Sequence, residues 1–151
     1  MITRRDILVA AIAIAATAAF VAFAQSPSKA IMHSRVFNWS DLKPRPTKTG
    51  EVRPVFDAPT AIMENFSCHI TTLNPGEMPH AAHKHVEEEL MIVKNGTLEA
   101  VQNGKTNRVE AGGMIFCASN EMHGLRNVGT NRATYYVLQW VPRDIAKITS
   151  K

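Results

Sequence analysis

Residues 76–96 read GEMPHAAHKHVEEELMIVKNG, and the histidines and glutamates of this stretch decide what the chain can build. His83, His85 and Glu89 carry odd numbers, so an extended backbone points their side chains to one face. Three ionisable groups on an apolar face are costly to desolvate unless a cation binds them. Imidazole nitrogen and carboxylate oxygen suit a first-row divalent metal, whereas calcium prefers oxygen ligands throughout. The stretch therefore predicts a metal site on a strand-like segment.

The sequence around this stretch is typical of an all-β domain. From about residue 51 onward, short apolar runs rich in β-branched residues alternate with turn residues, such as Asn95-Gly96 and Asn103-Gly104. Strands are expected at residues 52–56, 61–73, 89–94, 97–102, 106–110, 114–117, 122–128 and 133–141. About eight short strands at this spacing indicate a jelly roll or a small barrel.

The first of two motifs in this region resembles a motif of the cupin family. The cupin form is a glycine, five or so residues, His-x-His, three or four residues, a glutamate, six residues and a glycine. Here Gly76 stands six residues before His83-Lys84-His85. Glu89 follows after three residues and Gly96 after six more. The opening gap is one residue longer than the commonest form, which is a minor departure in a loop.

The second cupin motif is matched between Gly112 and Asn127, with His123 at the position of the family's last metal ligand. Ala118 and Asn120 replace the proline and the glycine of the motif, and asparagine is a fair substitute where a positive φ is needed. The resemblance implies an all-β fold, namely a single-domain cupin jelly-roll β-barrel. It also implies one divalent metal ion, bound by His83, His85, Glu89 and His123.

The first 24 residues have the features of an export signal. Arg4 and Arg5 precede an uncharged, Ala-rich run that ends at Ala22-Phe23-Ala24. This order is typical of a twin-arginine signal peptide that is cleaved after Ala24. The alternative is an uncleaved membrane anchor over residues 7–24, which are just numerous enough to cross a bilayer. We expect cleavage, a periplasmic or secreted location, and no stable membrane insertion afterwards.

The mature chain is expected to have three parts. Residues 25–50, which include Pro44-Arg45-Pro46, are typical of a linker and N-terminal arm. Residues 51–144 are expected to form the cupin β-barrel, and residues 145–151 a C-terminal tail. Within the arm, residues 36–39 are candidates for an edge strand on the barrel or on a neighbouring subunit, which would support a homodimer.

Charge and cysteine content narrow the possible partners. The chain has 17 basic and 13 acidic residues, and they are scattered without a basic run that interleaves with aromatic residues. Nucleic acid is therefore not an expected partner. Cys68 and Cys117 lie among apolar residues of expected strands, so buried free thiols are the favoured interpretation. A disulfide stays open as the alternative, because an exported protein permits one.

Several other residues are candidates for the wall of the metal pocket. They are Met78, Met91, Phe116, Arg126, Tyr135 and Gln139. Arg126 has a guanidinium that pairs well with a substrate carboxylate. His80 is expected on an exposed loop, with a place beside the ligands as the alternative. His69 is expected to be structural, and Glu88, of opposite parity to Glu89, is expected to be solvated.

The resemblance implies chemistry at an open metal ion. Three imidazoles and one carboxylate leave one or two free positions on a six-coordinate ion. The leading hypothesis is a metal-dependent enzyme that acts on a small organic acid or oxygenated small molecule, by dioxygenase, oxidase, decarboxylase or isomerase chemistry. The alternative is a non-catalytic small-molecule-binding or sensing cupin. Because the twin-arginine route exports folded proteins, loading in the cytoplasm favours manganese or iron over nickel, zinc or copper.

Overall fold

The computed structural model describes residues 29–144 of the 151-residue chain. The chain divides between Ala30 and Ile31 into two compact units, and all the elements below belong to the second unit. The expected signal peptide (residues 1–24) and C-terminal tail (residues 145–151) lie outside the described residues. Among residues 29–144, no helix has both the length and the apolar character needed to cross a bilayer.

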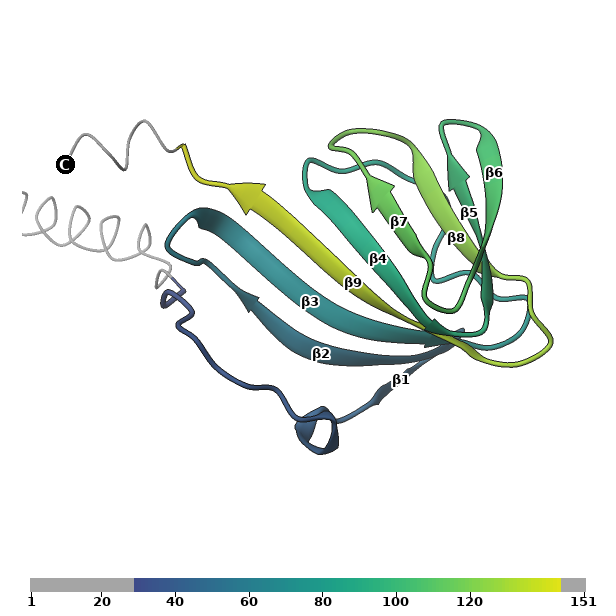
Figure 1. The fold of residues 1–151 in the computed structure, drawn as a ribbon, viewed down its shortest axis with the longest axis horizontal. Coiled ribbons are helices and arrows are strands. Elements are labelled where there is room, and N and C mark those ends of the chain that lie inside the picture. Colours follow the sequence, from purple (N-terminus) through teal and green to yellow (C-terminus); the bar gives the residue numbers. More distant parts are fainter. Residues whose placement is uncertain (1–28, 145–151) are drawn as a thin grey trace, which may run out of the picture. The chain divides into compact units, whose positions relative to one another are not determined.

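Strands dominate the described residues (Figure 1). They are β1 Arg45–Thr47, β2 Gly50–Ala58, β3 Met63–Leu73, β4 Glu88–Asn95, β5 Thr97–Gln102, β6 Lys105–Glu110, β7 Met114–Cys117, β8 His123–Asn127 and β9 Ala133–Pro142. One antiparallel sheet has the strand order β1-β2-β3-β9-β4-β7, and a smaller one has the order β6-β5-β8. Neighbours such as β3 and β9 are distant in sequence, as the crossovers of a jelly roll require. The predicted all-β jelly roll is confirmed.

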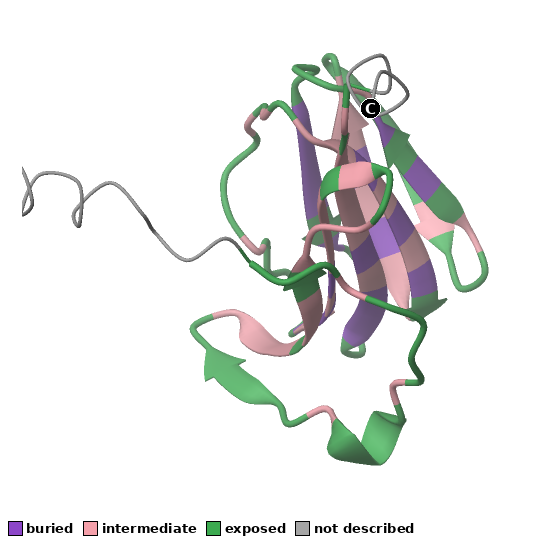
Figure 2. Cartoon of the chain, turned by 90° about the vertical axis from the view of Figure 1, so that its left-hand side faces the viewer, coloured by how far each residue is buried: buried purple, intermediate pink, exposed green. Residues whose placement is uncertain are grey.

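Side-chain alternation fills the space between the two sheets. In β3, β4, β7 and β9, odd-numbered residues point inward, and the register sets Glu89 opposite both Gln139 and Cys117. Figure 2 shows buried residues along the strands of the barrel. The core cluster consists of Leu73, Met91, Val93, Leu98, Ala100, Ile115, Cys117, Leu125, Ala133, Tyr135 and Val137. Glu89 shares the inner face of β4 with Met91 and Val93 and is only 6% exposed.

Two turn positions next to the barrel depend on an unusual backbone conformation. Asn120, where the cupin motif has glycine, adopts a φ of 60°, as expected for a residue that tolerates this region. Gly96 has a φ of 88°, and a Cβ atom there would lie 2.5 Å from the Cβ of Ala133. Both the backbone angle and the close approach therefore require glycine at position 96.

Asn127 fastens the end of β8 to two other segments. Its Nδ2 donates to the carbonyls of Leu73 at 3.1 Å and Asn131 at 2.9 Å, and its Oδ1 accepts from the N–H of Gly129 at 3.0 Å. The side chain is 0% exposed. This motif asparagine is thus a structural residue that satisfies buried backbone groups at one end of the barrel.

Replacement of Asn127 by Ala should lower the free energy of unfolding by about 1–3 kcal/mol, because buried backbone groups lose their partners. Urea unfolding followed by circular dichroism measures the change. Asn107→Ala is the matched control, because Asn107 is exposed on β6, and its effect should stay within about 0.5 kcal/mol. Equal stability of the two variants would contradict the role given to Asn127.

The N-terminal arm contains more regular structure than the sequence indicates. A 3-10 helix, η1, covers Trp39–Asp41, and β1 pairs with β2 along its whole length. Strand pairing therefore begins at Arg45, inside the segment 25–50 that was expected to be a linker and arm. The signal for β1 is weak because the strand is short and contains Pro46, which only an edge strand tolerates.

Aromatic contacts hold this arm against the larger sheet of its own barrel. The ring of Phe37 lies 5.3 Å from that of Phe56 on β2. The Trp39 ring lies 4.8 Å from the guanidinium carbon of Arg53 and 3.5 Å from Nζ of Lys94, which are cation–π contacts. Arg53 is on β2 and Lys94 is on β4, so the Trp39 ring contacts side chains from two strands of the larger sheet. Residues 36–39 are therefore not an edge strand.

Both cysteines are free and buried, as predicted. Cys68 is on β3 and Cys117 is on β7, with β9 and β4 between them. Three strand spacings amount to about 14 Å, which is beyond the reach of a disulfide. Burial raises the pKa of each thiol to about 11. Both side chains are therefore protonated at neutral pH in the metal-free protein.

Candidate metal centre

The loop before β4 is joined to the start of β8 by backbone hydrogen bonds. His83 and His123 form an isolated antiparallel bridge, in which the N–H of each donates to the carbonyl of the other at 2.9 Å. Nearby, the N–H of Asn120 donates to the carbonyl of His85 at 2.7 Å. The bridge places the rings of His83 and His123 with their centroids 4.8 Å apart. Two distant parts of the sequence thereby contribute to one site.

Backbone carbonyls orient two of the imidazoles. Nδ1 of His123 lies 2.9 Å from the carbonyl oxygen of Glu121, and Nδ1 of His85 lies 3.1 Å from that of Glu87. A carbonyl only accepts, so each Nδ1 carries the proton and each Nε2 presents a lone pair. Metal-binding histidines in proteins are commonly held in this way.

Glu89 faces these imidazoles from β4. Its Oε2 accepts a hydrogen bond from Nε2 of Gln139 at 2.6 Å and lies 3.7 Å from Nε2 of His85. Its Oε1 lies 4.0 Å from Nε2 of His123. A carboxylate this deeply buried is costly beside neutral imidazoles unless a positive charge is present.

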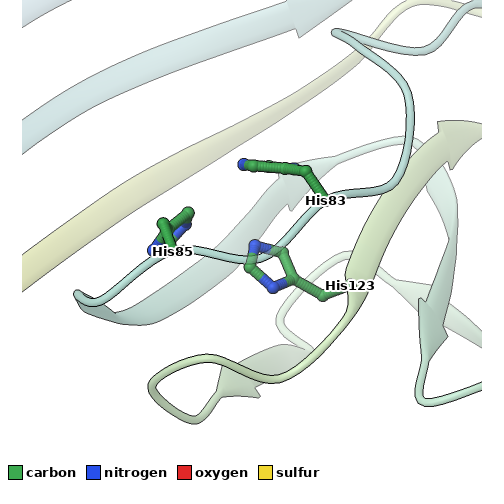
Figure 3. A group of neighbouring side chains, drawn as sticks. All are labelled: His83, His85 and His123. Carbon is green, nitrogen blue, oxygen red and sulfur yellow. The ribbon is translucent and has the colours of Figure 1, made fainter.

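The donor atoms fit a divalent metal ion. Figure 3 shows the three imidazoles of His83, His85 and His123 gathered in one place, and their donor atoms lie within 4.8 Å of one another. Glu89, Cys117 and His123 form an overlapping group within the same limit. Nδ1 of His83 and Nε2 of His123 are buried without a hydrogen-bond partner. Buried polar atoms are normally satisfied, and a cation would satisfy these. The structure thus gathers His83, His85 and His123 and places the carboxylate of Glu89 beside His85 and His123.

Electrostatics favour the metal-binding form of His83. Burial lowers the pKa of this imidazole, the neighbouring His80 lowers it further, and Glu89 acts in the opposite direction. His83 is therefore neutral at neutral pH, and neutral imidazole is the form that coordinates a metal.

A cavity of about 120 Å³ adjoins the donor atoms. Its lining consists of His69, Thr71, Pro79, His80, His83, Glu89, Met91, His123, Gly124, Leu125, Tyr135, Val137 and Gln139. Three of the predicted pocket residues, Met91, Tyr135 and Gln139, are therefore in its wall. Burial raises the pKa of Tyr135, against a smaller opposing effect of a hydrogen bond with Thr71. Its phenol is accordingly a neutral hydrogen-bonding group.

Three other predicted pocket residues do not line this cavity, which corrects the sequence-based expectation. They are Arg126, Phe116 and Met78. Arg126 lies an odd number of residues after His123 and so faces the opposite side of β8, where its Nε donates to the carbonyl of Gly76 at 3.1 Å. Met78 is exposed in the loop between β3 and β4.

The outer face of the larger sheet holds the third of these residues. Phe116 stacks on Trp140 with 6.3 Å between the ring centroids. Nε1 of Trp140 donates to Oε2 of Glu88 at 2.9 Å. Glu88 thus faces away from the cavity, as its parity predicts, but it is half-buried and hydrogen-bonded rather than simply solvated.

Two histidines outside the predicted ligand set lie in the cavity wall. His69, which was expected to be only structural, is on β3, and burial lowers its pKa while Glu89 acts to raise it. His80 is exposed at the cavity, with its ring centroid 4.3 Å from that of His83. The sequence could have predicted the position of His69, because it is two residues from Thr71 and four from Leu73 and so shares the inner face of β3 with them.

The described residues form a jelly roll with a cluster of histidine and carboxylate side chains that could hold a metal ion. Residues 69–139 match the family model described as Cupin domain. This segment, which is similar to a cupin domain, includes all four candidate ligands. Among curated proteins, no match to the sequence is found.

Solved cupin structures have a similar fold. An RmlC-like cupin from Shewanella frigidimarina has 12% identity and a TM-score of 0.60, covering 76% of this chain and 96% of its own. A predicted oxalate decarboxylase from Thermotoga maritima has 21% identity and a TM-score of 0.58, and the match covers 71% of this chain and 99% of that chain. The polyketide cyclase RemF from Streptomyces resistomycificus has 22% identity and a TM-score of 0.58, and the match covers 72% of this chain and 80% of that chain. At these identities the likeness concerns the fold.

Replacement of Gln139 by Leu should weaken metal binding by roughly 10- to 100-fold, the usual effect of removing a group that orients a ligand. The physical reason is the loss of the hydrogen bond that fixes Oε2 of Glu89. Competition with a chelating dye measures the affinity. Arg126→Gln is the control, because Arg126 lies outside the cavity lining, and its affinity should match that of the unaltered protein. An unchanged affinity in Gln139→Leu would refute the orienting role.

Proposed function

We propose that the chain is an exported, metal-dependent cupin enzyme that acts on a small organic acid or oxygenated small molecule. The ion is bound by His83, His85, Glu89 and His123. The observation that carries this proposal is the buried Nε2 of His123, which has no hydrogen-bond partner and lies 4.0 Å from Oε1 of Glu89. Such a pair of groups is explained by a cation between them.

The charge of the site supports an anionic substrate. When bound, a divalent ion supplies a Lewis-acid or redox centre. Glu89 offsets only part of the ion's charge, since the three imidazoles are neutral, so the site remains positive and attracts a carboxylate or an enediolate. Gln139 and the carbonyl-bound histidines keep the ligands oriented before a substrate enters.

The shape and lining of the cavity support a small substrate. A volume of about 120 Å³ suits a compact molecule. Met91, Leu125 and Val137 provide an apolar part of the wall that limits access of water. Thr71 and Tyr135 provide hydroxyl groups that hydrogen-bond to a polar substrate.

His69 supports catalysis over simple binding. It lies in the wall of the same cavity and is none of the four proposed ligands. Burial lowers its pKa, so its imidazole is neutral at neutral pH and can accept a proton. The site then contains both an electrophilic centre and a base. The names of two fold neighbours, a predicted oxalate decarboxylase and a polyketide cyclase, also point to chemistry on small oxygenated molecules.

A non-catalytic binding or sensing cupin is the alternative function. It is favoured by the small volume of the cavity, about 120 Å³, which suits the capture of one small molecule. The two functions differ in whether His69 is required for turnover or only for affinity.

Export, metal identity and assembly complete the proposal. The twin-arginine-type sequence at residues 1–24 supports export to the periplasm or beyond after cytoplasmic metal loading. Loading there supports manganese or iron, because copper and zinc would otherwise compete on affinity. A homodimer is proposed from the resemblance to cupins.

Protein purified from its own cells should contain close to one manganese or iron ion per chain, as measured by inductively coupled plasma mass spectrometry. His123→Ala should lose this metal, because it removes the buried lone pair at the centre of the donor set. His33→Ala is the matched control, since His33 is exposed and outside the cavity lining, and it should retain the metal. Stoichiometric zinc would refute the choice of metal, and metal-free protein would refute the enzyme proposal.

Replacement of His69 by Gln should lower kcat by roughly 10²- to 10⁴-fold for any acid that the protein converts, because a general base is lost. The assay is a panel of small carboxylic acids and oxygenated aromatics with fully metal-loaded protein, and His33→Gln is the control. The pH profile of kcat should also lose its acidic limb in His69→Gln. Binding of a compound without turnover by the unaltered protein would support the binding module instead.

A further inference from the structure

Cys117 lies beside the proposed metal ligands on an element that supplies none of them. It is the last residue of β7 and pairs in register with Glu89 of β4, with both side chains on the inner face. Its side chain is 2% exposed. Its Sγ, a carboxylate oxygen of Glu89 and a ring nitrogen of His123 lie within 4.8 Å of one another.

The unpartnered nitrogen of His123 is common to both groups of donors. His123 is 4% exposed, its Nε2 has no hydrogen-bond partner, and it belongs to the triple-histidine group as well as to the group with Cys117. Donors on opposite sides of one ion, at about 2.3 Å for sulfur and about 2.1 Å for nitrogen, lie about 4.4 Å apart. The limit of 4.8 Å within which Sγ of Cys117 and the ring nitrogen of His123 lie is therefore close to the largest separation that two donors of one ion can have.

Gln102 holds the sulfur in this place. It pairs in register with His123, and from β5 its Nε2 donates to the carbonyl of Phe116 and to Sγ of Cys117 at 3.8 Å. A donor that points at sulfur favours the thiolate over the thiol. The hydrogen bond thus links the smaller sheet to β7 at the position of the metal site.

We propose that Cys117 is a fifth ligand of the metal ion, bound through its thiolate sulfur. This inference rests on the proposed function, since it concerns the same ion. As the metal enters, the S–H bond of Cys117 breaks, a sulfur–metal bond forms, and the proton leaves to solvent. Three imidazoles, one carboxylate and one thiolate then neutralise a divalent ion and leave one position for a substrate.

A thiolate changes which metals the site prefers. Carboxylate and water ligands suit manganese, whereas thiolate favours softer ions. Of the two metals proposed above, iron therefore fits the five-ligand site better than manganese. The five-ligand site also lacks the net positive charge of the four-ligand site, so the contacts that cavity residues such as Thr71 and Tyr135 make to a substrate matter more.

Cys68 provides a matched control for this proposal. It is also buried, and burial raises its pKa to about 11, as for Cys117. It alternates with His69 on β3, however, and so belongs to the opposite face from the cavity. The two thiols differ in position, not in burial.

The test is a titration of the full chain with cobalt(II), after removal of bound metal by a chelator. The expected result is a thiolate-to-cobalt charge-transfer absorption in the near ultraviolet that saturates at one ion per chain. Cys117→Ser should still bind cobalt without this absorption, whereas Cys68→Ser should retain it. Cobalt binding without the absorption in the unaltered protein, or its persistence in Cys117→Ser, overturns the proposal. Failure of the unaltered protein to bind cobalt overturns the metal-dependent function as well.

X-ray absorption of the zinc-loaded, unaltered protein tests the same point without a substitution. One sulfur neighbour at about 2.3 Å from zinc is expected. A shell of nitrogen and oxygen neighbours alone overturns the role of Cys117, while leaving the metal site itself in place.

Discussion

The paired backbone hydrogen bonds between His83 and His123, each 2.9 Å long, fix the geometry of the whole site. They join a loop that follows β3 to the first residue of β8, and so bring the larger sheet and the smaller sheet together where the ligands lie. Each histidine has its place because the backbone beside it is paired. The imidazoles then need little further ordering when a metal binds, which reduces the entropy lost on binding.

Local periodicity predicted much of the fold and part of the site. The even spacing of His83, His85 and Glu89 placed them on one face without any knowledge of the tertiary structure. Arg126 was nevertheless predicted to line the pocket, although the same alternation puts it, three residues from His123 on one strand, on the opposite face of β8. His123 itself came from the resemblance to cupins, because no rule of strand geometry joins residues so far apart in the sequence.

Register between strands is the information that the sequence lacks. The approach of Gln139 and Cys117 to Glu89 depends on pairing of β9 and β7 with β4, which long-range packing decides. His69 was undervalued for the same reason, since its parity shows a face but not the cavity behind it. The strand at Arg45–Thr47 was missed because it is held by pairing with β2 rather than by its own propensity.

The positions of the two tryptophans have an optical consequence. Trp140 donates to Glu88, the neighbour of Glu89 along the chain, whereas Trp39 belongs to the N-terminal arm and lies against Lys94. Indole emission responds to such local charges, so each residue reports on a different region. A Trp39→Phe protein would emit from Trp140 alone, because the chain has 2 tryptophans. The emission of Trp140, on the outer face of the sheet, would then report on changes at Glu89, on the inner face, because its partner Glu88 is the neighbour of Glu89 on β4.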